Sequence, residues 1–157
     1  MTLTLLIDTN VWVDNYCADH TNSAAARACI HKAHALGHTL VYPAGCIKDI
    51  FYVLGHEYRR MAVAANDALG EKESLAAREA VWGCVNNICE LATAVGVDEA
   101  DVWLARKQRR LTEDLEDNLV LAAARRAQAD YLVTNDRALI QHSNVAALTP
   151  EDMLTVL

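Results

Sequence analysis

The stretch LLIDTNVWVD, Leu5 to Asp14, decides how the rest of the chain is interpreted. It joins an apolar run, Leu5–Ile7, directly to the carboxylate of Asp8. An uninterrupted apolar run predicts a strand buried on both faces, as in a parallel sheet covered by helices. The carboxyl end of such a strand is where open α/β sheets bind ligands. Asp8 is therefore the first candidate functional residue, with helix capping as the alternative explanation for it.

Length and composition predict one globular domain over residues 1–157, since 53% of the residues are hydrophobic and 22% are charged. No apolar stretch approaches the roughly 20 residues that span a bilayer, and the N-terminus lacks the basic segment of a signal peptide. The five cysteines are irregularly spaced, which fits reduced thiols. We therefore expect a cytoplasmic protein without a membrane segment.

The net charge of −7 argues against a general nucleic-acid coat protein, which needs a basic surface. It does not argue against an enzyme that holds phosphate through metal ions, because the metals then supply the positive charge. The charge also suits a protein with a basic regulatory partner.

Short apolar segments that predict strands alternate along the chain with segments that predict helices. The predicted strands are Leu3–Ile7, Thr39–Tyr42, a short one within Leu91–Val97, Tyr131–Thr134 and Asn144–Leu148. The predicted helices or helical turns are Asn10–Tyr16, Ser23–Leu36, residues 45–60, Met61–Leu69, Ser74–Cys89 with Ser74 as its cap, Asp98 to Arg110, Asp114–Gln128 and a terminal one after Thr149. This alternation predicts an α/β fold with a central parallel sheet and helices on both faces.

Two of the predicted strands deliver an aspartate at or just past their carboxyl ends. Asp8 follows Leu3–Ile7, and Asp136 follows Tyr131–Thr134. In a parallel sheet these ends lie at the same edge, so the two carboxylates are expected to converge. Helix N-capping remains the alternative for each of them.

Two more aspartates lie on apolar helix faces. At 100° per residue, Asp117 shares a stripe with Val120 and Leu121, where an unpaired charge costs several kcal/mol. Asp49 lies in the segment 45–60, which is apolar almost all round and is expected to be buried on most of its surface. The alternative for Asp49 is a partly exposed or ion-paired side chain. A bound cation would resolve both cases, and oxygen ligands of this kind suit Mg²⁺ or Mn²⁺, ions that activate water for phosphoryl chemistry.

Four stretches of the chain resemble the PIN domain family, in the same order and at similar spacing. They are LLIDTNVWVD, CIKDIFYVL, DLEDNLVLAAARRAQADYLVTNDRAL and ALTPEDML. The resemblance implies a three-layer α/β/α PIN-like fold and a Mg²⁺- or Mn²⁺-dependent ribonuclease that acts on RNA. It also implies frequent homodimers and, for VapC-like members, a toxin that is paired with an antitoxin protein in a VapBC-type system.

Carried over by position, the resemblance implies four catalytic acids, of which all but the second hold metal: Asp8, Asp49, Asp117 and Asp136. Asn10 and Thr134 match supporting polar positions near the first and last acids. The departure is Asp49, because most of the family has Glu at that place. A catalytically silent PIN-like module that binds RNA or protein is therefore the alternative function.

A receiver-type phosphorylation domain also gathers aspartates at strand ends, but it needs a lysine after a late strand. No lysine follows Gln108 in this chain. Contacts to the RNA backbone are expected from basic residues around the cleft, with solvated helix faces as the alternative for each group: Arg59–Arg60, Arg106–Lys107 with Arg109–Arg110, and Arg125–Arg126. The tryptophans are expected to be core or dimer anchors rather than base-stacking platforms: Trp12, Trp82 and Trp103.

Overall fold

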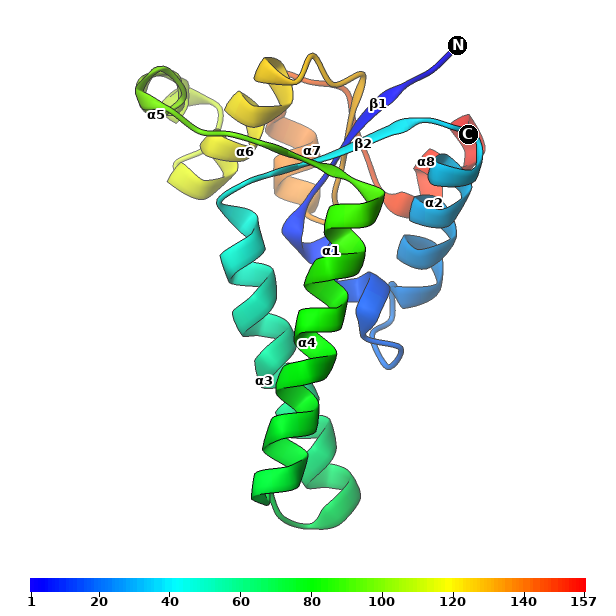
Figure 1. Cartoon of the computed structure of the whole chain (residues 1–157). Coiled ribbons are helices and arrows are strands. Elements are labelled where there is room, and N and C mark those ends of the chain that lie inside the picture. Colours follow the sequence, from blue (N-terminus) through cyan, green and yellow to red (C-terminus); the bar gives the residue numbers. More distant parts are fainter.

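Five parallel strands form one sheet in the order β3-β2-β1-β4-β5, so that the first strand of the chain lies at its centre. The computed structural model describes residues 1–157 (Figure 1). The strands are β1 Thr4–Ile7, β2 Thr39–Pro43, β3 Thr93–Val95, β4 Tyr131–Val133 and β5 Ala147–Leu148. The register pairs Ile7 with Val133, which brings the carboxyl ends of β1 and β4 together.

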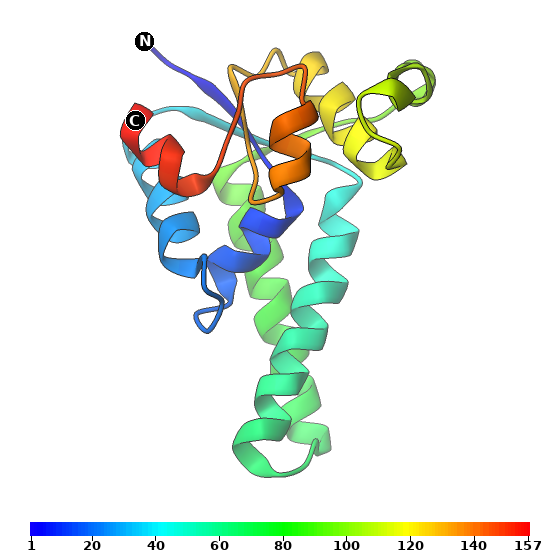
Figure 2. The same cartoon turned by 180° about the vertical axis from the view of Figure 1, so that it is seen from behind.

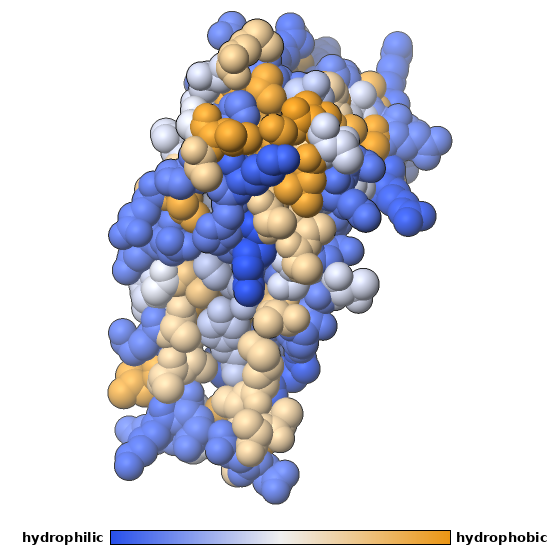
Figure 3. Space-filling model, turned by 90° about the vertical axis from the view of Figure 1, so that its right-hand side faces the viewer, coloured by the Kyte–Doolittle hydropathy of each residue, from blue (hydrophilic) through white to orange (hydrophobic).

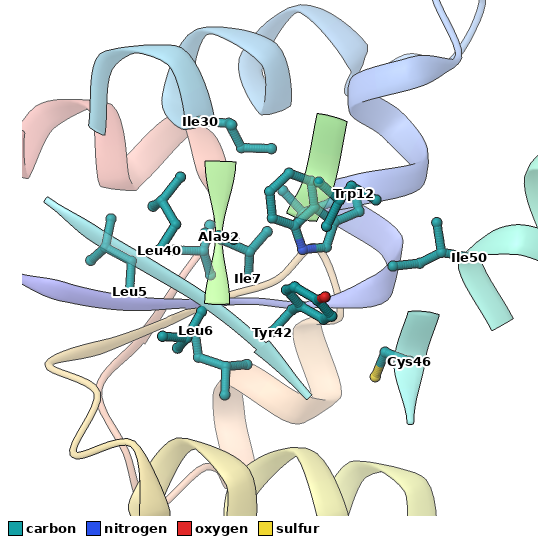
Figure 4. Close-up of a cluster of buried hydrophobic side chains, with 14 of the residues drawn as sticks. Leu5, Leu6, Ile7, Trp12, Ile30, Leu40, Tyr42, Cys46, Ile50 and Ala92 are labelled. Atoms are coloured by element: carbon teal, nitrogen blue, oxygen red, sulfur yellow. The ribbon is translucent and has the colours of Figure 1, made fainter. Parts of the chain in front are cut away.

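Eight α-helices and one 3-10 turn surround the sheet. They are α1 Thr9–Tyr16, α2 Ser23–Ala35, α3 Cys46–Asn66, α4 Glu71–Leu91, α5 Glu99–Lys107, η1 Gln108–Arg110, α6 Leu115–Arg126, α7 Arg137–His142 and α8 Pro150–Val156. Helices α2 and α8 lie on one side of the strands and α6 lies on the other (Figure 4). The expected three-layer α/β/α fold with a parallel sheet is confirmed.

The core is built on β1. Leu5, Leu6 and Ile7 are fully buried, as their apolar run predicts, and they belong to a cluster of 30 buried residues. Trp12 of α1 is also fully buried and packs in this cluster, where Figure 4 shows its ring between the sheet and Ile30 of α2. Asp8 therefore stands at the junction of the most buried strand and a helix that is anchored in the core.

Helices α3 and α4 form a long hairpin that extends away from the sheet (Figures 1 and 2). The prediction of a separate helix at Met61–Leu69 is wrong, because α3 continues to Asn66 and ends where Asp67 takes a left-handed conformation. The predicted cap at Ser74 is also wrong, because α4 begins directly after Gly70. Residues such as Met61 and the following alanines favour helix, so nothing local interrupts α3 before the hairpin turn.

The expectation that residues 45–60 are buried on most of their surface is wrong as well. Only Cys46, Ile50 and Leu54 of α3 are buried, while Tyr52 and Val53 are exposed. The hairpin leaves the body of the domain, so α3 packs mainly against α4 and α1. The apolar segment of α3 therefore belongs to a projecting helical hairpin, and its outward-facing side chains contact solvent.

The outer surface of the body is mixed in character. Figure 3 shows apolar side chains gathered in the upper part of one face, with hydrophilic side chains around them. Leu36, after α2, and Val156 of α8 are among the exposed apolar residues. None of the helices is both long and apolar enough to cross a lipid bilayer.

Candidate active site

A hollow of about 420 Å³ lies at the carboxyl end of β1, and we call it the acidic hollow. Twelve residues line it, and six of them are acids: Asp8, Asp14, Asp114, Glu116, Asp117 and Asp136. No lysine or arginine lines it, and His20 is its only basic side chain. Three of the four acids expected at the site, Asp8, Asp117 and Asp136, thus share one hollow although they come from three different parts of the chain.

Asp8 is buried, and three hydrogen bonds orient its carboxylate. Its Oδ1 accepts the Thr9 N–H at 2.7 Å, which makes Asp8 the N-cap of α1. Its Oδ2 accepts the Thr134 hydroxyl at 2.7 Å and the Asn10 side-chain amide at 2.8 Å. Burial raises the pKa of Asp8, and the charge of Asp136 raises it further against the hydrogen bonds that lower it. Asp8 therefore both caps α1 and lines the acidic hollow.

The end of β4 lies beside Asp8. Thr134 is fully buried, and besides donating to Asp8 its hydroxyl oxygen accepts the Asp136 N–H at 3.1 Å. Oδ1 of Asp136 accepts the N–H groups of Ala138 and Leu139 and so begins α7, a helix that the sequence analysis did not predict. Asp8 and Asp136 converge as expected for parallel strands, and each is also a helix cap.

Asp117 reaches the acidic hollow from the first turn of α6, which Asp114 caps. Its Oδ2 accepts the Thr112 hydroxyl at 3.4 Å, a long contact, and its Oδ1 has no hydrogen-bond partner in the protein. Burial and the charges of Asp114, Asp136 and Asp8 raise the pKa of Asp117 to about 6. The carboxylates of this hollow therefore repel one another in the metal-free protein.

Asp49 lies apart from the other three expected acids. It lines a smaller adjoining hollow of about 220 Å³, its side chain is 42% exposed, and one oxygen lies 3.5 Å from Lys48 Nζ. Glu116 lines both hollows. Burial and then the charge of Asp49 raise the pKa of Glu116, with smaller effects from Asp114 and Asp8. Asp49 therefore adjoins the acidic hollow, and Glu116 is the acid that the two hollows share.

Polar residues beyond those expected from the sequence also line or support the acidic hollow. Asp14 Oδ1 lies 2.7 Å from His20 Nδ1, and the side-chain amide of Asn135 donates to Asp14 Oδ2 at 2.8 Å. The Asn135 N–H donates in turn to Asn10 Oδ1 at 3.0 Å. Asn10 and Asp14 are four residues apart and so share one face of α1, a signal that could have identified Asp14. Nothing in the local sequence around His20 predicts that this residue lines the acidic hollow.

The side chains fit a divalent cation by their chemistry, although they are not arranged as a ready set of ligands. No three His, Cys, Asp or Glu side chains are positioned to hold a metal ion as they stand. The hollow nevertheless gathers six carboxylates without a lysine or arginine, and Oδ1 of Asp117 and Oδ2 of Asp136 accept no hydrogen bond. Oxygen donors of this kind suit Mg²⁺ or Mn²⁺, whose charge would relieve the repulsion.

The family model of the PIN domain matches residues 4–138, which include every expected site residue. The chain belongs to the PIN domain family. PIN domains are generally nucleases, so membership supports a hydrolase that acts on nucleic acid. Among curated proteins, none matches this chain.

Asp117→Asn is expected to raise the stability of the metal-free protein at neutral pH. The pKa of Asp117 is raised from 3.8 to about 6, so the folded protein binds this proton more tightly than the unfolded chain does. Its contribution to stability is fully present below about pH 4 and is lost as the pH rises through about 6. Urea unfolding in EDTA at a series of pH values should show a flatter pH dependence in the variant than in the wild type. Asp67→Asn at the hairpin turn is the control, and an unchanged profile in Asp117→Asn would contradict a raised pKa at Asp117.

Proposed function

We propose that this chain is a metal-dependent endoribonuclease that hydrolyses phosphodiester bonds of RNA. The observation that carries the proposal is that Asp8, Asp117 and Asp136 line one acidic hollow within the residues that match the PIN domain. Nuclease activity belongs to the family in general. The choice of RNA and of a metal mechanism rests on the resemblance of the motifs and on the chemistry of the hollow.

In this proposal Asp8, Asp117 and Asp136 hold Mg²⁺ or Mn²⁺ through their carboxylate oxygens. The ion, when bound, supplies an activated water and neutralises charge on the phosphate and the leaving oxygen. Asn10 and Thr134 hold Oδ2 of Asp8 in place, since both donate hydrogen bonds to it. Their role is to fix the position of the carboxylate rather than to contact the RNA.

We assign Asp49 the part of orienting the attacking water from the adjoining hollow. Asp is one methylene shorter than Glu, which most of the family has at this place, and Asp49 is paired with Lys48 in the structure. The charges of Asp49 and Asp8 both raise the pKa of Glu116, so Glu116 is close to both carboxylates. Glu116 is therefore a further acid at the edge of the proposed metal site.

Cleavage of a labelled RNA by the purified protein tests the proposal. We expect cleavage with added Mn²⁺ or Mg²⁺, none with EDTA, and recovery when the metal is supplied in excess. Cleavage that continues unchanged in EDTA would reject the metal mechanism. Binding of RNA without cleavage under any of these conditions would favour the catalytically silent module instead.

We further propose that the cleavage serves a toxin of the VapBC type, acting on RNA in the cytoplasm as a homodimer and restrained by an antitoxin protein. The resemblance of the motifs to VapC-like toxins supports this assignment. Growth arrest upon expression in a bacterium, relieved by co-expression of a neighbouring small gene, is the expected result. Normal growth during expression of an active enzyme would contradict the toxin role.

A further inference from the structure

Four cations gather in an open hollow of about 770 Å³ at the end of α5 and in η1. The hollow is lined by Arg106, Lys107, Arg109, Arg110 and Glu113. All four cations are exposed, and none of them forms a salt bridge or a side-chain hydrogen bond. By contrast, Arg60 pairs with Asp19 and Glu57, and Arg126 pairs with Asp98 and Asp101. Among the three basic groups of the sequence, only this one has no side chain in an ion pair.

An exposed aromatic side chain adjoins these cations. Trp103 of α5 is 59% exposed, so it is not the core anchor that the sequence suggested, and Lys107 Nζ lies 5.5 Å from the centre of its ring. The two residues are four apart, so they lie on the same helix face. Cationic side chains beside an exposed aromatic ring are the combination that binds single-stranded nucleic acid, because the cations contact phosphates while a base stacks on the ring.

The basic hollow and the acidic hollow are lined by residues that are adjacent in the sequence. Glu113 lines the basic hollow and Asp114, the next residue, lines the acidic one. The α-carbons of neighbouring residues are about 3.8 Å apart. The Thr112 hydroxyl oxygen accepts the Asp114 N–H at 2.9 Å, and the hydroxyl also contacts Asp117, so this connection is held in place. The two hollows therefore lie close enough for one polynucleotide strand to reach both.

We propose that the α5–η1 surface, defined as Trp103, Arg106, Lys107, Arg109 and Arg110, binds the single strand of RNA that flanks the phosphate to be cleaved. This inference rests on the proposed function, which places that phosphate in the acidic hollow. A protein of net charge −7 needs a local source of attraction for RNA, and these free cations supply it. A base can stack on Trp103 only where the strand is unpaired, which selects single strands over duplexes.

The test measures binding of a short fluorescein-labelled single-stranded RNA by anisotropy in EDTA over a series of salt concentrations. For Arg109→Ala/Arg110→Ala we expect the slope of log affinity against log salt to become shallower by about 1.4, since each phosphate contact contributes about 0.7. Trp103→Ala should weaken binding about ten-fold with a smaller change of slope. Lys72→Ala/Arg78→Ala removes the same charge from exposed positions on α4 of the hairpin and should leave the slope unchanged.

An equal change of slope in the hairpin control would overturn the proposal, because any exposed cation would then serve. Tighter binding of duplex RNA than of single strands, or equal competition by single-stranded DNA, would overturn the assigned ligand. The nuclease proposal is tested separately, because binding is measured in EDTA. Loss of binding in the α5–η1 variants without cleavage by the wild type would reject the nuclease alone, whereas cleavage that is equally fast in these variants would reject the surface alone.

Discussion

Asp8→Asn is expected to abolish metal-dependent cleavage of RNA while the chain remains folded. The substitution keeps the size of the side chain but removes the charge that would bind the cation. Loss of a residue that only supports a metal ligand costs roughly 10–100-fold in affinity or activity, so loss of the ligand itself should cost more. Single-turnover rates with saturating Mn²⁺ give the change in cleavage, and calorimetry gives the change in Mn²⁺ binding.

The matched control for this variant is Asp67→Asn. It makes the same chemical change at the hairpin turn, where the side chain is exposed and the left-handed backbone accepts Asn readily. Circular dichroism and urea unfolding establish that both variants are folded. A rate for Asp8→Asn equal to that of the control would remove Asp8 from the chemistry and with it the proposed mechanism.

Trp12→Ala is expected to cause the largest loss of stability, about 3–5 kcal/mol in the free energy of unfolding. Trp12 is fully buried, and the space left by its ring would lie within the main core cluster (Figure 4). Its Nε1 has no hydrogen-bond partner, so the ring stabilises the fold by packing rather than by a polar contact. Trp12→Phe should therefore cost less, because it keeps an aromatic ring and removes the unsatisfied N–H.

Urea unfolding at constant pH measures these losses. Trp82→Ala is the control, because Trp82 lies on α4 of the hairpin and is 50% exposed. Its loss should cost less than half as much as that of Trp12, since much of its ring already contacts water. Similar values for Trp12→Ala and Trp82→Ala would show that Trp12 does not anchor α1 in the core.

The Trp12 effect would extend to the acidic hollow. Helix α1 begins at the cap formed by Asp8 and carries Asn10, which donates to Asp8, and Asp14, which lines the hollow. Displacement of α1 would therefore move several polar groups together. The same apolar anchoring that stabilises the sheet also positions these side chains.

The sequence was sufficient for features that depend on neighbouring residues. The apolar run Leu5–Ile7 predicted a buried central strand, and the structure confirms it. The strand-end positions of Asp8 and Asp136 predicted that they would converge, and both line the acidic hollow. Such patterns are reliable because strand burial and parallel pairing place every carboxyl end at one edge of the sheet.

The sequence pattern of α3 was not sufficient to predict which of its residues are exposed. An apolar helix face has the same appearance whether it packs in the core or along a projecting hairpin, so the exposure of Tyr52 and Val53 could not be predicted. For the same reason Asp49 was expected on a buried face. Asp49 is half-exposed beside Lys48, on a helix that extends away from the sheet.

By itself, the sequence determined the parallel α/β fold, the central place of LLIDTNVWVD and the strand ends that carry Asp8 and Asp136. Only the tertiary structure decided which further acids share their hollow and which cations remain free. Glu116 and Asp14 enter the hollow, and Arg109 and Arg110 stay unpaired, through the packing of α1, α5 and α6. The physical reason is that burial and charge pairing between distant segments depend on how helices pack, whereas strand patterns are local.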